Sequence, residues 1–260
     1  MRKYKFKITF GLTMIFLAVG IIRTALPSEN TYEELLKKAM LPVGNTMYVW
    51  GGGWSSLDNA AGEEATTIGV SKRWAEFAAT CDATYDYETT RYQNHDGLDC
   101  SGYIGWLIYN VFEDSSGKKG YVMSSTKMAE TFASYGWGSY TPAEKVKNYR
   151  PGDIMSMPGH VWLCLGMCKD GSVLLVHASP PGVRVCGTLS QEGKETEAVA
   201  LATWFMKTYY SQWYTKFPGC GVNYDYLEKS AQFRWYPNIL SDKKGISKMS
   251  AEEIVMNVLK

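Results

Sequence analysis

The sequence predicts an α+β protein in which a long helix packs on an antiparallel β-sheet. Apolar residues recur at helical spacing from Ser101 to Phe112, which predicts a helix that begins at about Cys100. Segments 160–166 and 173–176 are rich in strand-forming residues and flank the turn Lys169-Asp170-Gly171, which predicts a β-hairpin. Of the 260 residues, 45% are hydrophobic and 20% are charged, which excludes disordered, collagen-like and multi-span membrane proteins.

The N-terminal segment 1–30 has the pattern of an export signal. Four basic residues between Arg2 and Lys7 precede an uncharged run over 8–22, which Arg23 closes. We expect a signal peptide or a single N-terminal membrane anchor, with a buried N-terminal helix as the alternative. Because positive charge before the run keeps the start inside, the rest of the chain is expected to be extracytoplasmic, either secreted or membrane-anchored.

The next segments contain two short helices and a glycine turn. Segment 31–40 is predicted to be a helix, since Glu residues come early and Lys residues late, in favourable positions for the helix dipole. The apolar stretch 47–50 runs into a glycine turn. Segment 55–95 is polar and aromatic without a clear period, so it is interpreted as an insertion, with a helix at 71–79.

The second half of the chain is predicted in less detail. Segment 187–236 mixes aromatic and polar residues and permits no assignment. We therefore expect a domain over 31–186 and a C-terminal extension over 187–260 that packs on it, with the aromatic residues of the extension in the core. Further predicted elements are a helix at 125–135, a strand after the turn Pro151-Gly152-Asp153, a strand at 183–185 and a closing helix from the capping box of Ser250 and Glu253 to Leu259.

Charge and cysteine patterns exclude several classes of partner and cofactor. Apart from 1–30, which holds five basic residues and one acidic one, the chain has 22 basic and 25 acidic residues, so no nucleic-acid binding is expected. Residues 160, 164 and 168 resemble a metal stripe on a helix, but the strand-forming residues around them argue against a metal site. The cysteines do not fit a disulfide framework; they are Cys81, Cys100, Cys164, Cys168, Cys186 and Cys220.

The most reactive candidate is Cys100, in the run Asp99-Cys100-Ser101-Gly102. At a helix N-terminus, free backbone N–H groups and the helix dipole favour the thiolate, so we expect a nucleophile with a low pKa. The same N–H groups can form an oxyanion hole. Gly102, beside the small Ser101, is expected to let a substrate backbone approach.

A nucleophilic thiol needs a base, and the chain offers three histidines. His160 begins one strand of the predicted hairpin and His177 ends the other, so His160 can take the thiol proton while His177 orients its ring. His95, in the polar insertion, is expected to be a surface residue. The same pattern fits a buried structural cysteine and two core histidines equally well.

Four ordered blocks between about residues 45 and 186 resemble the NlpC-type family of bacterial cell-wall cysteine peptidases. The blocks are Tyr48-Val49-Trp50-Gly51-Gly52, Asp99-Cys100-Ser101-Gly102-Tyr103, Arg150-Pro151-Gly152-Asp153-Ile154 with Gly159-His160-Val161 and Leu165-Gly166, and Val176-His177-Ala178-Ser179. The resemblance implies a papain-like fold, and hydrolysis of peptidoglycan stem peptides, commonly between D-glutamate and the diamino acid. The implied hydrolysis needs no metal or organic cofactor.

Carried over residue by residue, the resemblance makes Cys100 the nucleophile, His160 the base and His177 the orienting residue. It also implies that Tyr48 supports the oxyanion or the substrate, and that Asp99 and Ser101 contact a substrate amine. The alternatives are an amidase that cuts between muramic acid and L-alanine, and a non-catalytic wall-binding module on the same scaffold.

Two features depart from the family pattern. Tyr48 and Cys100 are 52 residues apart, a longer link than in most members, so the insertion is expected to border the cleft and affect specificity. Trp162 stands where the family more often has a small residue. By strand alternation Trp162 shares a face with His160, so it either contacts substrate beside the histidine or packs in the core.

Overall fold

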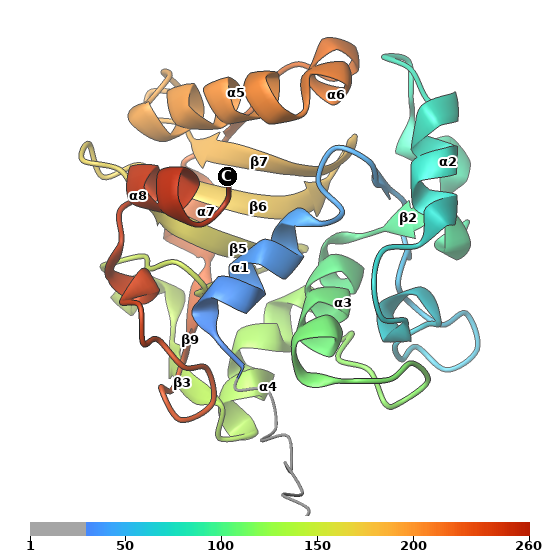
Figure 1. Ribbon diagram of the computed structural model, residues 1–260, viewed down its shortest axis with the longest axis horizontal. Helices are drawn as coiled ribbons and strands as arrows, with labels where there is room; N and C mark the ends of the chain where they lie inside the picture. Colours follow the sequence, from blue (N-terminus) through green and yellow to red (C-terminus); the bar gives the residue numbers. More distant parts are fainter. Residues whose placement is uncertain (1–29) are drawn as a thin grey trace, which may run out of the picture.

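The computed structural model describes residues 30–260, which form a mixed α+β structure around one curled sheet (Figure 1). The main path of the sheet has the order β2-β1-β7-β6-β5-β4-β9-β3, and β8 pairs with β7. The strands are β1 (Met47–Tyr48), β2 (Gly97–Leu98), β3 (Gly138–Thr141), β4 (Ile154–Met157), β5 (His160–Met167), β6 (Val173–Ser179), β7 (Gly182–Thr188), β8 (Gly221–Val222) and β9 (Ala231–Trp235).

The helices confirm each of the helical segments expected before residue 187 and the closing helix. Residues 125–134 form a short 3-10 helix followed by an α-helix, and Ser250 and Glu253 form the expected capping box. The α-helices are α1 (Tyr32–Met40), α2 (Lys72–Thr80), α3 (Cys100–Phe112), α4 (Met128–Ser134), α5 (Glu197–Tyr209), α6 (Ser211–Lys216), α7 (Asp225–Lys229) and α8 (Ala251–Asn257).

The predicted hairpin forms the centre of the sheet. Strands β5 and β6 pair antiparallel across the turn at 169–171, and β7, which contains the predicted strand 183–185, pairs antiparallel with β6. One face of these strands carries apolar side chains such as Leu163, Val176 and Val185, on which α3, α5 and α8 pack. The opposite face carries His160, Trp162 and His177 by alternation, and side chains of α7 pack against it.

The C-terminal extension is part of the sheet and not an addition to its surface. Strand β9 lies between β4 and β3 and pairs antiparallel with both, and β8 extends the other half of the sheet at β7. Apolar residues from Tyr32 to Val258 share one buried cluster. The expected boundary near residue 186 therefore does not separate two cores.

A buried ion pair fastens β9 to the turn before β4. Asp153 is 1% exposed and accepts hydrogen bonds from the guanidinium of Arg234 at 2.6 and 2.8 Å, and from the side-chain amide of Gln232 at 3.0 Å. Burial raises the pKa of Asp153, and the Arg234 charge opposes that shift. Removal of either partner would leave an uncompensated buried charge.

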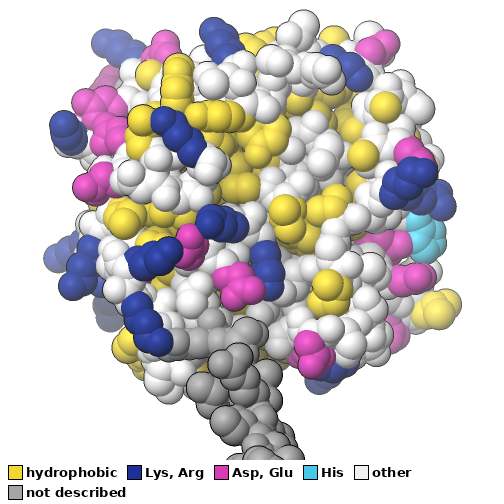
Figure 2. Space-filling view, in the orientation of Figure 1, with side chains coloured by type: hydrophobic (Ala, Val, Ile, Leu, Met, Phe, Trp, Pro, Cys, Tyr) yellow, Lys and Arg dark blue, Asp and Glu magenta, His cyan; other side chains and the backbone are white. Residues whose placement is uncertain are grey.

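The expected export signal over 1–30 lies almost wholly outside the described residues. Within residues 30–260, no helix has the length and apolar character needed to cross a membrane. On the face shown in Figure 2, both basic and acidic side chains lie around the rim, and hydrophobic side chains are exposed across the middle.

Candidate active site

Close contacts between glycines hold the turn after β1 against the start of α3. A Cβ on Gly102 would lie 2.0 Å from the carbonyl oxygen of Gly52, and a Cβ on Gly52 would lie 2.4 Å from that of Gly97. Gly102 is therefore needed for packing between backbone segments. This corrects the expectation that Gly102 leaves room for a substrate backbone.

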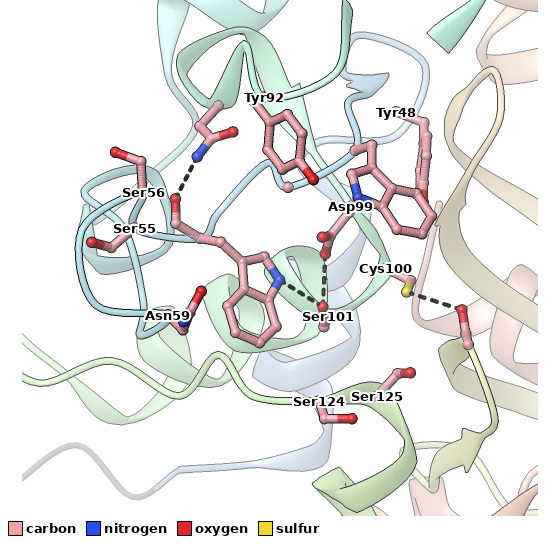
Figure 3. Close-up of a pocket in the computed structure, with 15 residues that line it drawn as sticks. Tyr48, Ser55, Ser56, Asn59, Tyr92, Asp99, Cys100, Ser101, Ser124 and Ser125 are labelled. Carbon is pink, nitrogen blue, oxygen red and sulfur yellow. Dashed lines mark hydrogen bonds between the residues drawn. The ribbon is translucent and has the colours of Figure 1, made fainter. Parts of the chain in front are cut away.

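Asp99 forms the N-cap of α3 and ties it to the same turn. Its Oδ1 accepts hydrogen bonds from the Gly102 N–H at 2.7 Å and from the Ser101 hydroxyl at 2.8 Å. Ser101 in turn accepts a hydrogen bond from the Trp54 indole at 2.9 Å (Figure 3). Burial raises the pKa of Asp99 to about 6. Both Asp99 and Ser101 are thus committed to internal hydrogen bonds, although both still line the cavity described below.

Cys100 lies at the first position of α3, as predicted, but its thiol is not acidic. The side chain is 6% exposed, and the thiol donates to the carbonyl oxygen of Gly159 at 3.9 Å. Burial raises the pKa of Cys100 to about 12, the nearby Asp99 adds to the shift, and the N–H groups of Val161, Ser101 and Cys100 itself oppose it. The prediction of a low pKa is therefore wrong, because burial outweighs the helix terminus.

The two hairpin histidines meet as predicted. His160 Nε2 and His177 Nδ1 are 3.0 Å apart, which leaves Nδ1 of His160 for another partner. Burial lowers the pKa of His160 to about 4, and burial together with the charges of His160 and Arg184 lowers that of His177. Both rings are neutral at pH 7. His95 is exposed and pairs with Glu64, as expected of a surface residue.

The Cys100 thiol contacts the backbone on both sides of His160. Cys100 contacts the carbonyl of Gly159 and the N–H of Val161, the two residues that flank His160 in the chain. The site therefore joins a thiol, an imidazole with a free nitrogen and backbone N–H groups at a helix start. Such an arrangement is suited to nucleophilic attack on a carbonyl carbon with proton transfer to the ring.

Tyr226, from α7, also belongs to this site and was missed by the sequence analysis. Its ring centroid lies 5.3 Å from that of His160 and 5.9 Å from that of His177. The ring therefore covers both histidines on one side and helps to exclude water from them. No sequence signal pointed to it, because it lies in the segment 187–236 that could not be assigned.

Trp162 packs in the core and does not line the cavity. It is completely buried, its indole N–H donates to Ser230 at 3.0 Å, and its ring stacks on Tyr149 with the centroids 6.3 Å apart. This corrects the expectation of a substrate contact and supports the alternative of core packing. These partners come from the residue that follows α7 and from the segment before β4, which the hairpin pattern alone does not reveal.

A cavity of about 510 Å³ opens beside Cys100 (Figure 3). Four of the predicted site residues line it, whereas His160 and His177 are not among the lining residues. Ser55, Ser56 and Asn59 lie across the view from Cys100 in Figure 3, so the 55–95 segment borders the cavity. The lining residues are Tyr48, Trp50, Gly51, Trp54, Ser55, Ser56, Asn59, Tyr92, Asn94, Asp99, Cys100, Ser101, Ser124, Ser125 and Gly159.

Tyr48 lies between the cavity and the insertion. It is 7% exposed, and its ring meets that of Tyr87 edge-on at 5.4 Å. Burial raises the pKa of Tyr48, and the adjacent Cys100 and Asp99 raise it further. The phenol therefore keeps its proton and can donate a hydrogen bond to a group bound beside Cys100.

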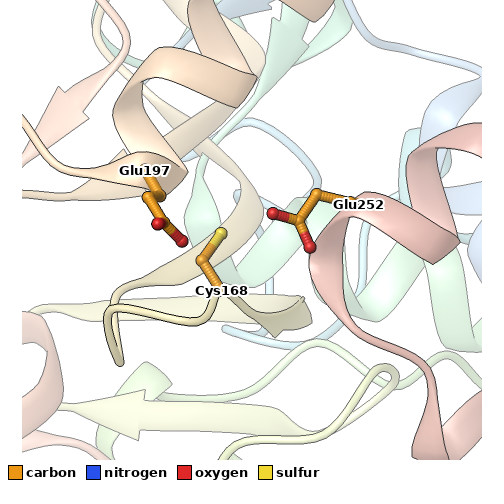
Figure 4. Close-up of side chains that lie close together, drawn as sticks. All are labelled: Cys168, Glu197 and Glu252. Atoms are coloured by element: carbon orange, nitrogen blue, oxygen red, sulfur yellow. The ribbon is translucent and has the colours of Figure 1, made fainter.

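All six cysteines are free thiols, and among the described residues positions 160, 164 and 168 do not form a group of metal ligands. Among the described residues, one group has donor atoms close enough to hold an ion: Cys168, Glu197 and Glu252, whose ligand atoms all lie within 4.8 Å of one another (Figure 4). Glu197 accepts hydrogen bonds from the backbone N–H groups of Lys169 and Asp170. It thus fastens the hairpin turn to α5.

Comparisons of the chain with protein-family models, with curated proteins and with solved structures found no match.

Proposed function

We propose that this protein is a cysteine peptidase that hydrolyses amide bonds in peptidoglycan stem peptides. The observation that carries the proposal is the position of the Cys100 thiol, in the wall of a cavity and between the two residues that flank His160. His160 in turn bonds to His177 through Nε2. The proposed nucleophile thus contacts the backbone on both sides of the proposed base, and the ring of that base is bonded to the proposed orienting group.

The raised pKa of Cys100 and the lowered pKa of His160 favour a mechanism that starts from the neutral pair. Nδ1 of His160 takes the thiol proton as the sulfur attacks the amide carbonyl carbon, while Nε2–H donates to Nδ1 of His177. The imidazolium gives this proton to the leaving amine, which departs and leaves a thioester. Water, deprotonated by His160, then hydrolyses the thioester and restores the thiol.

Donors for the developing oxyanion lie close to the sulfur. The N–H groups of Cys100 and Ser101 point to the position of the thiol, and the phenol of Tyr48 lines the same cavity. We assign the stabilisation of the tetrahedral intermediate to these groups.

The substrate class rests on the resemblance of the four sequence blocks to NlpC-type peptidases. It favours a papain-like arrangement and cleavage between D-glutamate and the diamino acid. The basic and apolar pattern of residues 1–30 supports export, so that the catalytic part faces the cell wall. The chemistry proposed for the thiol requires no cofactor.

The test is mass spectrometry of muropeptides of defined structure after incubation with the purified full chain. We expect products whose masses locate the cut at the D-glutamyl to diamino acid bond. Release of intact stem peptide from the sugar would instead identify the amidase alternative. No cleavage of muropeptides from several wall types would overturn the proposal and favour a binding module.

A further inference from the structure

The wall of the cavity on the side of the insertion has no role in the proposed chemistry. It presents aromatic rings to solvent, since Trp50 is 42% exposed and Tyr92 is 70% exposed, and Trp54 lies beside them in the lining. The guanidinium of Arg91 lies 4.8 Å from the ring centroid of Trp50 and covers one face of that ring. Exposed rings in a cavity provide flat apolar surfaces on which a ligand can stack.

The polar groups around these rings are hydroxyls and amides. Ser55, Ser56 and Asn59 come from the insertion, and Ser124 and Ser125 close the cavity on another side (Figure 3). The lining formed by the described residues contains no lysine or arginine and one carboxylate, that of Asp99. The wall therefore suits an uncharged ligand with many hydroxyl and amide groups.

Asn94 adds a hydrogen-bond acceptor that lacks a partner among the described residues. The residue is 9% exposed, and its amide N–H donates to the Trp54 carbonyl at 2.7 Å, which fixes the orientation of the side chain. Its Oδ1 is buried and has no hydrogen bond, and the residue lines the cavity. A Cβ at Gly51 would lie 3.2 Å from this oxygen, a tight contact, so the glycine allows the backbone to pack closely against the amide. A small movement of the lining would let a bound N–H or O–H group satisfy this acceptor.

We propose that Trp50, Trp54, Asn59, Tyr92 and Asn94 form a carbohydrate subsite for an N-acetylated sugar of the glycan strand. This inference rests on the proposed function for the peptide part of the substrate, and it adds that the preferred substrate is a stem peptide still attached to its sugar. In an extended substrate, the two residues between the cut bond and the sugar span about 7 Å. The sugar then lies on the insertion side of the cavity while the peptide reaches Cys100.

The free stem peptide is the competing ligand, and the site is poorly equipped for it. Such a peptide begins with an ammonium group, which needs a negatively charged acceptor. Asp99 is the one carboxylate that residues 30–260 place in the lining, and its Oδ1 already accepts hydrogen bonds from Gly102 and Ser101. A peptide whose amine is acylated by the sugar carries no such charge.

The test is calorimetric titration of the full chain with a soluble tetramer of N-acetylglucosamine. Tyr92→Ala is the main variant, since Tyr92 is highly exposed and its loss should leave the fold intact. Tyr140→Ala is the matched control, because Tyr140 is 43% exposed and lies on β3, outside the lining. We expect wild type and control to bind equally, and Tyr92→Ala to bind about fivefold to tenfold more weakly. No saturable binding by wild type, or equal binding by all three, would overturn the inference.

Cleavage assays separate this inference from the proposed function. The same stem peptide is supplied with and without its disaccharide, and the two values of kcat/KM are compared for wild type. Equal cleavage of both forms without tetramer binding rejects the subsite and leaves the peptidase intact. Binding of the tetramer with cleavage of neither form rejects the peptidase and leaves a glycan-binding site.

Discussion

At the scale of residues, the site combines a thiol and two imidazoles that are all neutral at pH 7. The helix start favours the thiolate, as the sequence analysis assumed, but Cys100 is buried and lies beside Asp99, which opposes a second negative charge. His177 is buried and His160 is half-buried against it, and the removal of both rings from water lowers the pKa of each, so neither gains a proton easily. In the proposed mechanism, His160 therefore takes the thiol proton during the attack and not before it.

The rate at which Cys100 is alkylated should show directly that its thiol is neutral at pH 7. Because burial raises the pKa of Cys100 to about 12, its reaction with iodoacetamide should be slow at pH 6 and should still rise above pH 9. Peptide mapping by mass spectrometry measures the labelled fraction at each pH, with Cys81, which is partly exposed, as the internal reference. Rapid labelling of Cys100 at pH 6, ahead of Cys81, would indicate a thiolate and imidazolium pair and contradict the neutral site.

The stability of the fold should depend on the same histidines. His160 has a pKa of about 4 in the folded state against 6.5 in the unfolded chain, so between these values the unfolded state binds more protons. The free energy of unfolding therefore falls as pH falls through this window. The pKa of Asp99 is raised from 3.8 to about 6, so over most of this pH window the folded state binds more protons at Asp99 than the unfolded state does. The Asp99 contribution to the free energy of unfolding therefore rises as pH falls.

The variant His160→Gln isolates the contribution of His160 to the pH dependence of stability. The loss of unfolding free energy between pH 7 and pH 5, measured by urea denaturation, should be smaller in His160→Gln than in wild type by at most about 2 kcal/mol. The Asp99 contribution is common to both proteins and cancels in the comparison. An equal or larger loss in the variant would show that His160 is not held neutral.

At the scale of elements, a helix or strand could be predicted when it is long enough to show a periodic pattern and when the residues that define it lie close together in the sequence. Helix α3 and the β5–β6 hairpin follow from periodicity and turn residues that lie close together in the chain. Strands β1 and β2 have two residues each, too few for any periodicity, and depend on the glycine contacts between them. Strand β9 takes its place from pairing with β3 and β4, which are distant in sequence.

The site residues, too, could be predicted where a local sequence pattern marks them and not where contacts between distant segments bring them to the site. Cys100, His160 and His177 were identified because few residue types can carry this chemistry and their local patterns place them at ends of elements. Trp54, Asn94 and Tyr226 join the site through contacts between distant segments, so no local pattern marked them. Trp162 shares a sheet face with His160, but alternation could not show that Tyr149 and Ser230 cover it.

A methyl group added at Gly102, where the turn after β1 packs against α3, should destabilise the protein. In Gly102→Ala the new Cβ would lie 2.0 Å from the Gly52 carbonyl oxygen, so the turn must move away from Cys100. We expect a loss of about 2 kcal/mol or more in unfolding free energy, measured by chemical denaturation. Gly221→Ala is the control, because its Cβ would meet the Leu189 side chain at 3.3 Å or more, and it should change stability by about 0.5 kcal/mol or less. Equal stability of both variants would contradict the packing described for Gly102.

At the scale of the whole molecule, the segment after residue 186 completes the structure that holds the site. It supplies β9 to the sheet, Tyr226 to the histidines and α5 to one face of β7. The insertion supplies much of the cavity wall. The chemistry proposed for the site thus depends on one segment that precedes Cys100 in the chain and on another that follows His177.

Asp153→Ala tests this dependence. The substitution leaves the guanidinium of Arg234 without its buried partner and detaches β9 from the turn before β4, so we expect a loss of about 3 to 5 kcal/mol in unfolding free energy. Lys72→Ala is the control, because its pair with Glu76 is highly exposed and should contribute little. If Asp153→Ala were as stable as this control, the C-terminal segment would not be fastened as described.

The central claim is that Cys100 cuts peptidoglycan peptides, and the most direct test is the release of new amino groups from purified peptidoglycan. Wild type, Cys100→Ala and Cys81→Ala are compared at equal concentration, after circular dichroism has shown that each is folded. We predict release by wild type and by Cys81→Ala, whose thiol lies outside the cavity lining, and none above background by Cys100→Ala. Equal release by Cys100→Ala and wild type would contradict the account.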